Sequence, residues 1–238
     1  MTNLKAASAP NKDLTGRVEM EELAPVLDVC CGTKMMWFNK DDERCLYVDK
    51  RNESFRPIGR KFADKDVFVS PDIQADFTDL PFPSDSFSLV VFDPPHIARQ
   101  SVGNVTRYCG SLPVEWRDML RAGFTQCFRV LRPNGVLIFK WSEVEIPLRD
   151  VLALTDQEPL FGHRSGKAAK THWVCFIKPQ ARCIWTEETD PDGIPFLWNT
   201  GCGSAHEFNT GGPEENAHFF CPYCGKPLEI SYASEKEG

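Results

Sequence analysis

The chain has 238 residues, 42% of them hydrophobic, so it can form one sizeable α/β domain with a small appendage and is not a disordered protein. No run approaches the roughly 18 consecutive apolar residues of a membrane span, and the N-terminus lacks a basic start followed by an apolar segment. We therefore expect no membrane span and no signal peptide, and we predict a cytoplasmic protein. In such a protein, ten cysteines favour reduced thiols or metal ligands over disulfides.

Acidic charge is concentrated at the C-terminal end of the chain. From residue 181 onward, 3 Lys and Arg residues stand against 10 Asp and Glu residues. The first 180 residues therefore hold 24 basic residues (27 less 3) and 24 acidic residues (34 less 10), a balance of zero. The net charge of −7 thus belongs to the tail and does not exclude a nucleic-acid substrate for the main domain.

Short apolar runs predict the strands, and apolar residues at helical spacing predict the helices. In chain order the expected strands cover residues 25–29, 45–49, 67–69, 88–92 and 135–141, and the expected helices cover 116–131 and 144–154. Near-continuous apolar strands that alternate with helices imply a parallel sheet covered on both faces. The predicted fold class is therefore α/β, with a Rossmann-like, doubly wound, mainly parallel sheet.

The ends of the main domain are also indicated by the pattern. Residues 159–161 and 171–177 predict an antiparallel hairpin at one edge of the sheet. Residues 1–22 lack periodicity and are expected to form a flexible N-terminal arm. The main domain is then expected at 23–180, and a second unit, dense in Gly, Pro and Cys, at 181–238.

Acidic residues stand at or near the ends of four predicted strands. They are Asp28, Asp49, Asp76 and Asp93. In an open α/β sheet, ligands bind outside the carboxyl ends of the strands, and an acid about 20 residues after the first turn can accept hydrogen bonds from both hydroxyls of a ribose. A single acid at a strand end is usually only solvated, but four of them, with a glycine-containing first turn, favour the ribose interpretation of Asp49.

The segment Asp93-Pro94-Pro95-His96 directly follows the predicted strand 88–92. Each proline fixes its own φ, removes an N–H and restricts the residue before it, so the segment forms a rigid shelf beyond the strand. The Asp93 carboxylate and the Pro94 carbonyl offer two acceptors to the two N–H groups of an exocyclic amine, and His96 would pack against its ring. Asp93 could instead be a helix N-cap or a turn acid, but a diproline has no obvious use in a plain turn. The shelf therefore predicts methyl transfer to an amino nitrogen, a reaction that depends on positioning.

Several motifs in this order carry a resemblance. L-D-V-C-C-G, Y-V-D, F-D-P-P-H and F-R-V-L-R-P-N-G-V-L-I-F-K-W, within residues 25–178, resemble class I S-adenosylmethionine-dependent methyltransferases. More narrowly, C-C-G-T-K-M-M-W-F, F-D-P-P-H and P-L-F-G-H-R-S-G-K resemble bacteriophage or prophage methylases of the DNA-methylase type. The resemblance implies a closing antiparallel strand and S-adenosylmethionine as the cofactor.

The resemblance also implies roles for individual residues. Asp28, Cys30 and Gly32 would line the methionine end of the cofactor, Asp49 would hold the ribose, and Asp76 with Phe77 would flank the adenine. The chemistry of the shelf itself makes Asp93, Pro94 and His96 the expected catalytic residues. Two features depart from the family. Cys30 and Lys34 stand where glycine is frequent, and His96 stands where an aromatic residue usually stacks on the base.

The expected function is methyl transfer to an exocyclic amino group of a nucleic-acid base, adenine N6 in DNA, with a duplex base flipped out to reach the shelf. A methyltransferase for a small molecule or a protein is the alternative, because residues 79–87 resemble small-molecule methyltransferases and the chain has no large target-recognition domain. A non-catalytic binding module is a third possibility. The presence of Asp28, Gly32 and Asp49 counts against it.

Two basic stretches are candidates for phosphate contact. Residues 97–132 hold six arginines, beginning with Arg99, and the loop 163–170 contains Arg164, Lys167 and Lys170. Arginines on an amphipathic helix are usually only solvated. The 163–170 loop is the better candidate, because it contains glycine and is not helical.

The tail contains a second set of candidate ligands. Cys202 and His206 precede the knuckle Cys221-Pro222-Tyr223-Cys224-Gly225, whose two thiolates can face one metal ion. The tail resembles the zinc ribbons attached to phage proteins. We therefore predict a structural Zn²⁺ held by Cys202, His206, Cys221 and Cys224, with His218 as the alternative to His206, and a disulfide as the competing interpretation of the knuckle.

Overall fold

The computed structural model describes residues 23–58, 66–98, 103–165, 170–190 and 192–232. The chain divides into two compact units, Met1–Lys178 and Pro179–Gly238. The predicted N-terminal arm, residues 1–22, lies outside the described residues. None of the helices in the described part of the chain is long and apolar enough to cross a membrane.

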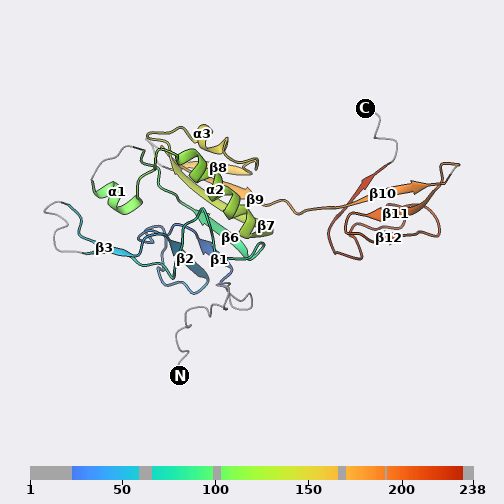
Figure 1. Ribbon diagram of the computed structural model, residues 1–238, viewed down its shortest axis with the longest axis horizontal. Helices are drawn as coiled ribbons and strands as arrows, with labels where there is room; N and C mark the ends of the chain where they lie inside the picture. Colours follow the sequence, from blue (N-terminus) through green and yellow to red (C-terminus); the bar gives the residue numbers. More distant parts are fainter. Residues whose placement is uncertain (1–22, 59–65, 99–102, 166–169, 191, 233–238) are drawn as a thin grey trace, which may run out of the picture. The chain divides into compact units, whose positions relative to one another are not determined.

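The first unit is built on a seven-stranded sheet of order β5-β2-β1-β6-β7-β9-β8 (Figure 1). Its strands are β1 (Val26–Asp28), β2 (Cys45–Asp49), β5 (Ile73–Gln74), β6 (Phe87–Phe92), β7 (Leu131–Ser142), β8 (Phe161–Ser165) and β9 (Thr171–Ile177). The first five strands pair in parallel, and β9 runs antiparallel to both β7 and β8. The mixed α/β class, the mostly parallel sheet and the antiparallel hairpin at its edge are therefore confirmed.

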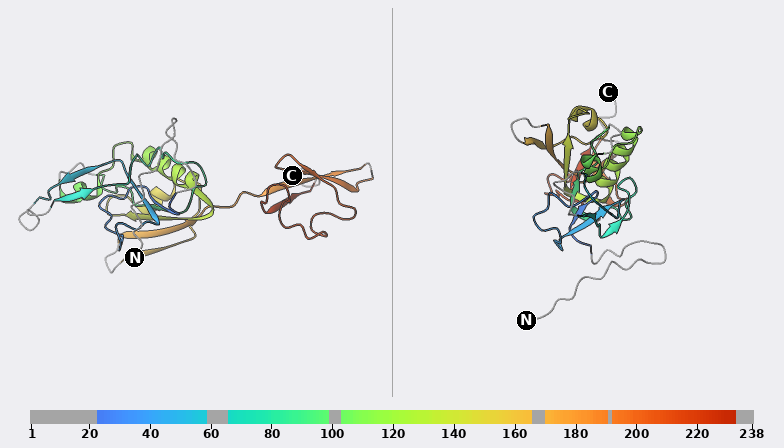
Figure 2. Two further views of the ribbon diagram at one scale, coloured as in Figure 1. Left: turned by 90° about the horizontal axis from the view of Figure 1, so that it is seen from below. Right: turned by 90° about the vertical axis from the view of Figure 1, so that its left-hand side faces the viewer.

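Helix α2 (Trp116–Val130) covers one face of this sheet. Figures 1 and 2 show it lying along the strands, and the ring of Phe124 lies 4.9 Å from that of Phe139 and 5.4 Å from that of Phe92. These rings are at most 1% exposed. Burial of large apolar side chains on this face fixes the register of the central strands, because a slip of one residue would turn each side chain to the other face.

The connection from β1 to β2, residues 29–44, forms turns instead of the helix that a doubly wound sheet usually has there. The small cluster that covers this side contains Cys31, Cys45 and Tyr47, with Val26 and Trp37 packed against it. The expectation of helical cover on both faces therefore does not hold for this connection.

Two further predictions differ from the structure. The strand Val67–Val69 (β4) pairs with β3 (Glu53–Phe55) in a separate two-stranded sheet, and β5 takes the place beside β2. Val69 is 1% exposed and Phe68 64% exposed, so β4 buries one face only, whereas the central strands of the main sheet are buried on both. The predicted helix 144–154 is reduced to α3 (Leu148–Leu152), which begins directly after Pro147. Proline favours the start of a helix and disfavours its interior.

The second unit is a four-stranded sheet of order β12-β11-β10-β13. Its strands are β10 (Cys183–Thr189), β11 (Pro195–Thr200), β12 (Ala205–His206) and β13 (Leu228–Ser231). Its buried core consists of Cys183, Trp185, Trp198 and Cys221. So few buried residues supply little stabilisation, and domains of this size commonly need a metal ion or disulfides.

Candidate functional site

A cavity of about 490 Å³ opens at the carboxyl ends of β1, β2, β6 and β7. Its walls come from residues 30–33, 35–36, 49–51, 53 and 93–96, from Phe77 and Lys140, and from the segment 106–111 that contains the end of α1 (Asn104–Cys109). The cavity therefore contains both the predicted cofactor segment after β1 and the predicted acceptor shelf after β6. Its volume lies in the range of small-molecule pockets, roughly 300–1,000 Å³.

Asp49 is held rigidly at the end of β2. The backbone N–H of Gly32 donates to Asp49 Oδ2 at 2.8 Å, and the backbone N–H of Arg51 donates to Oδ1 at 2.9 Å. Gly32 has φ of +53°, a left-handed conformation that glycine adopts without strain. Asp49 is 5% exposed, and its carboxylate points at the turn after β1. The geometry thus links the two predicted cofactor segments directly.

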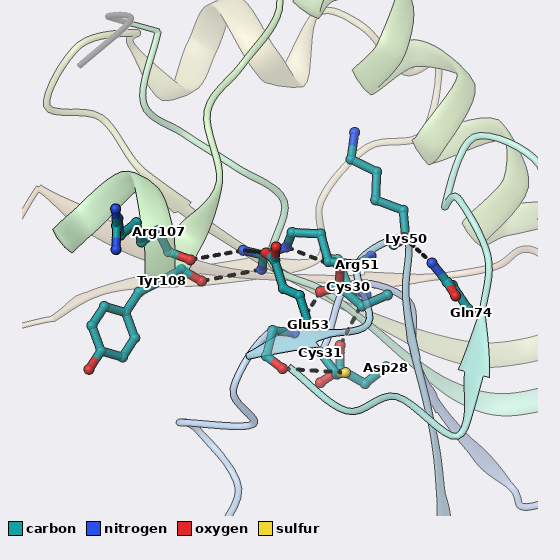
Figure 3. Close-up of polar contacts among 11 residues, drawn as sticks. Asp28, Cys30, Cys31, Lys50, Arg51, Glu53, Gln74, Arg107 and Tyr108 are labelled. Carbon is teal, nitrogen blue, oxygen red and sulfur yellow. Dashed lines mark hydrogen bonds and ion pairs between the residues drawn. The ribbon is translucent and has the colours of Figure 1, made fainter. Parts of the chain in front are cut away.

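Arg51 extends this link to the opposite wall of the cavity. Its Nη1 donates to the carbonyl oxygen of Arg107 at 2.9 Å and its Nη2 to that of Tyr108 at 3.3 Å (Figure 3). Its Nε lies 3.3 Å from Asp49 Oδ1. The guanidinium therefore ties the end of α1 to β2. Sequence reasoning did not single out Arg51, because its two carbonyl partners are 56 and 57 residues away along the chain.

Asp28 lies beneath the cavity rather than in its wall. It is 1% exposed, and its carboxylate accepts hydrogen bonds from Trp37 Nε1 at 2.8 Å and from the Cys30 N–H at 3.3 Å. Burial raises the pKa of Asp28 to about 7, against the lowering effect of these two donors and with the help of the negative fields of Asp93 and Asp49. This carboxyl is therefore poised between its neutral and ionised forms near neutral pH.

The two residues predicted to flank adenine are placed differently from each other. Phe77 is buried and lines the cavity. Asp76 does not line it, and its Oδ1 accepts hydrogen bonds from the N–H of Thr78 at 3.0 Å and from the Thr78 hydroxyl at 2.9 Å. Asp76 thus stabilises the turn that presents Phe77.

The acceptor shelf contains an ion pair that the sequence pattern did not reveal. Lys140 Nζ lies 2.6 Å from Asp93 Oδ2, and both side chains are largely buried. Lys140 is in β7, beside β6, where parallel pairing places it level with the residue after Phe92. The sequence shows that Lys140 stands near the end of an apolar strand, but its contact with Asp93 depends on which strands pair. Pro95 packs against Gly110, where an added Cβ would meet Pro95 Cγ at 3.1 Å.

His96 lines the same end of the cavity. Its ring meets that of Trp141 edge-on with centroids 6.2 Å apart, and its buried Nδ1 has no hydrogen-bonding partner among the described residues. Burial lowers the pKa of His96, and the field of Asp93 and the backbone of Pro94 only partly oppose this. The imidazole is therefore neutral at physiological pH.

Of the arginines in the predicted stretch 97–132, Arg107 lines this cavity, and its Nη1 donates to the Arg56 carbonyl at 2.9 Å. Arg99 and Lys167 lie outside the described residues, as does the side chain of Arg164, whose backbone is in β8. Lys170 is exposed, and its carbonyl oxygen accepts a hydrogen bond from the Glu143 N–H at 2.7 Å. Their contact with phosphate stays a prediction.

A cluster of four cysteines forms in the second unit: Cys183, Cys202, Cys221 and Cys224. Their sulfur atoms all lie within 4.8 Å of one another, and those of Cys202 and Cys221 are 3.7 Å apart. All four are free thiols. Burial tends to raise the pKa of Cys221, but the N–H groups of Cys224 and Tyr223 more than offset it and bring the pKa to about 6. The Thr200 hydroxyl lowers the pKa of Cys202, whereas burial raises that of Cys183 to about 12.

The fourth residue of this cluster is Cys183, whereas the sequence predicted His206 or His218 as the fourth ligand. Parallel pairing of β10 with β13, together with the Cys183 N–H donating to the Pro227 carbonyl at 2.8 Å, brings Cys183 to the knuckle. The His206 ring instead packs between Trp185 and Phe208, with its Nδ1 3.0 Å from the Tyr223 hydroxyl. Cys183 has no neighbouring cysteine in the sequence, so spacing alone did not reveal it.

No family model matches the chain, and no curated protein matches it either. Solved structures are similar to about two thirds of the chain. The PH0226 protein from Pyrococcus horikoshii is 15% identical over 64% of this chain and 81% of its own, with a TM-score of 0.39. The N-methyltransferase NodS from Bradyrhizobium japonicum is 16% identical over 65% and 85%, with a TM-score of 0.42. A TehB-like SAM-dependent methyltransferase from Corynebacterium glutamicum is 18% identical over 65% and 80%, with a TM-score of 0.41.

Proposed function

We propose that this protein is an S-adenosylmethionine-dependent methyltransferase that acts on an exocyclic amino group of a nucleic-acid base, with adenine N6 in DNA as its target. One observation carries the proposal. The shelf Asp93–His96 and the segment that holds Asp49 and Gly32 line a single cavity. A methyl donor bound at one end and an amine at the other would then meet within one site.

The residues of the cofactor end fit this role. A carboxylate has about four lone-pair sites, and the described N–H donors to Asp49 take one site on Oδ2 and two on Oδ1. Oδ2 therefore keeps acceptor capacity for a ribose hydroxyl. Cys30 and Gly32 would lie beside the methionine portion, and Phe77 offers an apolar ring to adenine. When bound, the cofactor supplies an electrophilic methyl group.

The acceptor end fits an amine. Lys140 pairs with Oδ2 of Asp93, and among the described residues no donor occupies Oδ1. Oδ1 can then accept one amino N–H, and the Pro94 carbonyl is proposed to accept the other. Holding both N–H groups aims the nitrogen lone pair along one direction, which is catalysis by positioning. A base in a duplex must be flipped out of the stack to reach this site.

The test is nucleoside mass spectrometry of DNA and RNA from cells that express the chain or its Asp93→Ala variant. We expect a methylated amino base in DNA from cells with the native chain and none with the variant. Methylation confined to RNA would move the target to RNA. Equal methylation levels with and without the chain, in both nucleic acids, would remove the nucleic-acid proposal.

The cavity volume of about 490 Å³ also suits a small-molecule amine, which is the second candidate. The same Asp93 and His96 would position it. Methyl transfer from labelled cofactor to extracted metabolites, with nucleic acids unlabelled, would favour this candidate. Loss of cofactor binding in calorimetry on Asp49→Ala would exclude a merely scaffolding role for the fold.

We further propose that the four-cysteine cluster holds a structural Zn²⁺ ion. Four thiolates bound to zinc at about 2.3 Å in a tetrahedron stand about 3.8 Å apart, close to the 3.7 Å between the sulfurs of Cys202 and Cys221. Four sulfur donors leave no open position, so the ion would fold the unit rather than catalyse a reaction. Zinc content near one per chain should be lost in Cys183→Ser and kept in His206→Ala. Loss in His206→Ala alone would restore histidine as the ligand.

A further inference from the structure

Three polar side chains line the acceptor end of the cavity. Asp93 and Lys140 face each other at 2.6 Å, with side-chain exposures of 18% and 25%. His96 is the third, and its neutral form adds no charge. Among these three lining side chains, the charges of Asp93 and Lys140 cancel, while Glu145 adds a negative field on His96 and the buried Asp28 adds one on Asp93 as it ionises.

Lys140 is fixed from more than one side. Its antiparallel partner in β9 is Trp173, whose ring centre lies 5.7 Å from Nζ. Its neighbours in β7, Phe139 and Trp141, are fully buried on the opposite face. The ammonium group consequently stays in the cavity beside Asp93, because β7 cannot rotate without exposing two large rings.

The other charged residues of the cavity are grouped around Asp49. Arg51 contacts Asp49 and lies 3.8 Å from Glu53, and it holds the Arg107 carbonyl (Figure 3). These charges belong to the end proposed for the cofactor. They leave the Asp93–Lys140 pair as the charge that a methyl acceptor meets at the shelf.

The Asp93–Lys140 ion pair decides which amines can bind. An alkylamine, like the lysine side chain with its pKa of about 10.4, is an ammonium ion at pH 7 and has no free lone pair. An isolated Asp93 would attract such a cation, and a cation as close as Lys140 opposes that attraction with comparable strength. An aromatic exocyclic amine is neutral and keeps its lone pair. It gains the hydrogen bond to Asp93 without meeting a repulsive charge.

We infer that Lys140 is a specificity-determining positioning residue that restricts the acceptor to neutral aromatic amines and excludes alkylammonium ions. This inference rests on the proposed amino methylation and names its substrate class. In the reaction, the amine lone pair forms the new N–C bond as the C–S bond breaks, and the electron pair of that bond goes to sulfur. The nitrogen, now positively charged, then loses one proton to water.

The test measures binding, so that it does not depend on turnover. Calorimetry on the full chain with bound S-adenosylhomocysteine compares two probes of similar size, adenine and benzylamine, at pH 7.5. The native chain should bind adenine more tightly than benzylamine. In Lys140→Met the ratio of the two affinities should shift toward benzylamine by about tenfold or more, because an unpaired Asp93 attracts the cation. Lys140→Arg retains the charge and should keep the native preference.

Lys178→Met is the matched control. Lys178 Nζ also contacts a carboxylate, that of Asp85, at 2.6 Å, but it does not line the cavity. It should leave the affinity ratio unchanged, which separates charge at the acceptor end from loss of an ion pair in general.

An unchanged ratio in Lys140→Met, or a native chain that binds adenine no more tightly than benzylamine, would overturn the inference. Lys140→Arg decides the matter if Lys140→Met does not fold, since a shift toward benzylamine in Lys140→Arg contradicts the charge argument. Failure of the proposed function is seen separately, as absence of a methylated amino base in the nucleoside analysis.

Discussion

Replacing Asp28 by Asn tests the electrostatic description of the site directly. Asp28 is 1% exposed, and burial raises its pKa from 3.8 to about 7, while the N–H groups of Trp37 and Cys30 partly oppose the shift. Nearby Asp93 and Asp49 raise it further through their negative charge. The folded protein therefore keeps a proton on this carboxyl over a pH range in which the unfolded chain has lost it.

The sign and size of the effect follow from this difference. Between about pH 4 and pH 7 the folded state binds the proton and the unfolded state does not, so the free energy of unfolding falls as pH rises through this window. A shift of about 3 pKa units corresponds to about 4 kcal/mol. An asparagine has no charge to desolvate. Above pH 7, Asp28→Asn should be more stable than the native chain by up to about 4 kcal/mol, less about 1 kcal/mol for the Cys30 N–H contact that an amide group matches poorly.

The assay is urea unfolding at pH 5, 6, 7 and 8. Unfolding is monitored by hydrogen exchange of peptides from β1 and β6, which report on the first unit separately from the second. The native chain should lose stability across this series, and Asp28→Asn should show a flatter profile. Trp37→Phe removes a donor to the carboxylate and should move the loss of stability to higher pH. Parallel pH profiles for the native chain and Asp28→Asn would refute the reasoning.

Three further predictions concern packing, cofactor and metal. Gly123→Ala should lower the free energy of unfolding by about 1–3 kcal/mol in urea unfolding, because an added Cβ would stand 2.7 Å from one buried phenylalanine ring and 2.9 Å from another. The control is Gly103→Ala, whose added Cβ meets nothing within 4 Å and should change the stability little. Asp49→Asn should weaken cofactor binding in calorimetry at least tenfold, and an unchanged affinity would remove Asp49 from the cofactor site. Chelation of zinc should abolish exchange protection in β10 and β13 and leave that of β6 intact; protection that survives in both would show that the cluster needs no metal.

The central strands could be predicted because they carry their own signal. The runs that became β1, β2, β6 and β7 are apolar on both faces and end in turn residues or acids, as strands buried on both sides require. The carboxyl ends of such strands meet at one edge, so a common site for Asp49 and Asp93 followed from chain order alone. Both segments do line one cavity.

What escaped prediction depends on pairing between distant segments. Lys140 meets Asp93 only because β7 lies beside β6, and Cys183 reaches the knuckle only because β10 lies beside β13. Neither partner is close in sequence, so no local spacing encodes the contact. The exchange of β4 for β5 in the main sheet has the same origin. A three-residue apolar run does not show which neighbour will bury it.

The alternation of side chains along β7 limits the kinds of mutation that the gene can tolerate. Along β7 the residue that serves the cavity, Lys140, alternates with the fully buried Phe139 and Trp141. Single substitutions can alter one face while leaving the other intact. A one-codon insertion or deletion before Lys140 would instead turn an ammonium group into the core and two aromatic rings outward. Natural variants of this segment should therefore differ by replacement and hardly ever by length, a pattern that sequencing of related genomes can reveal.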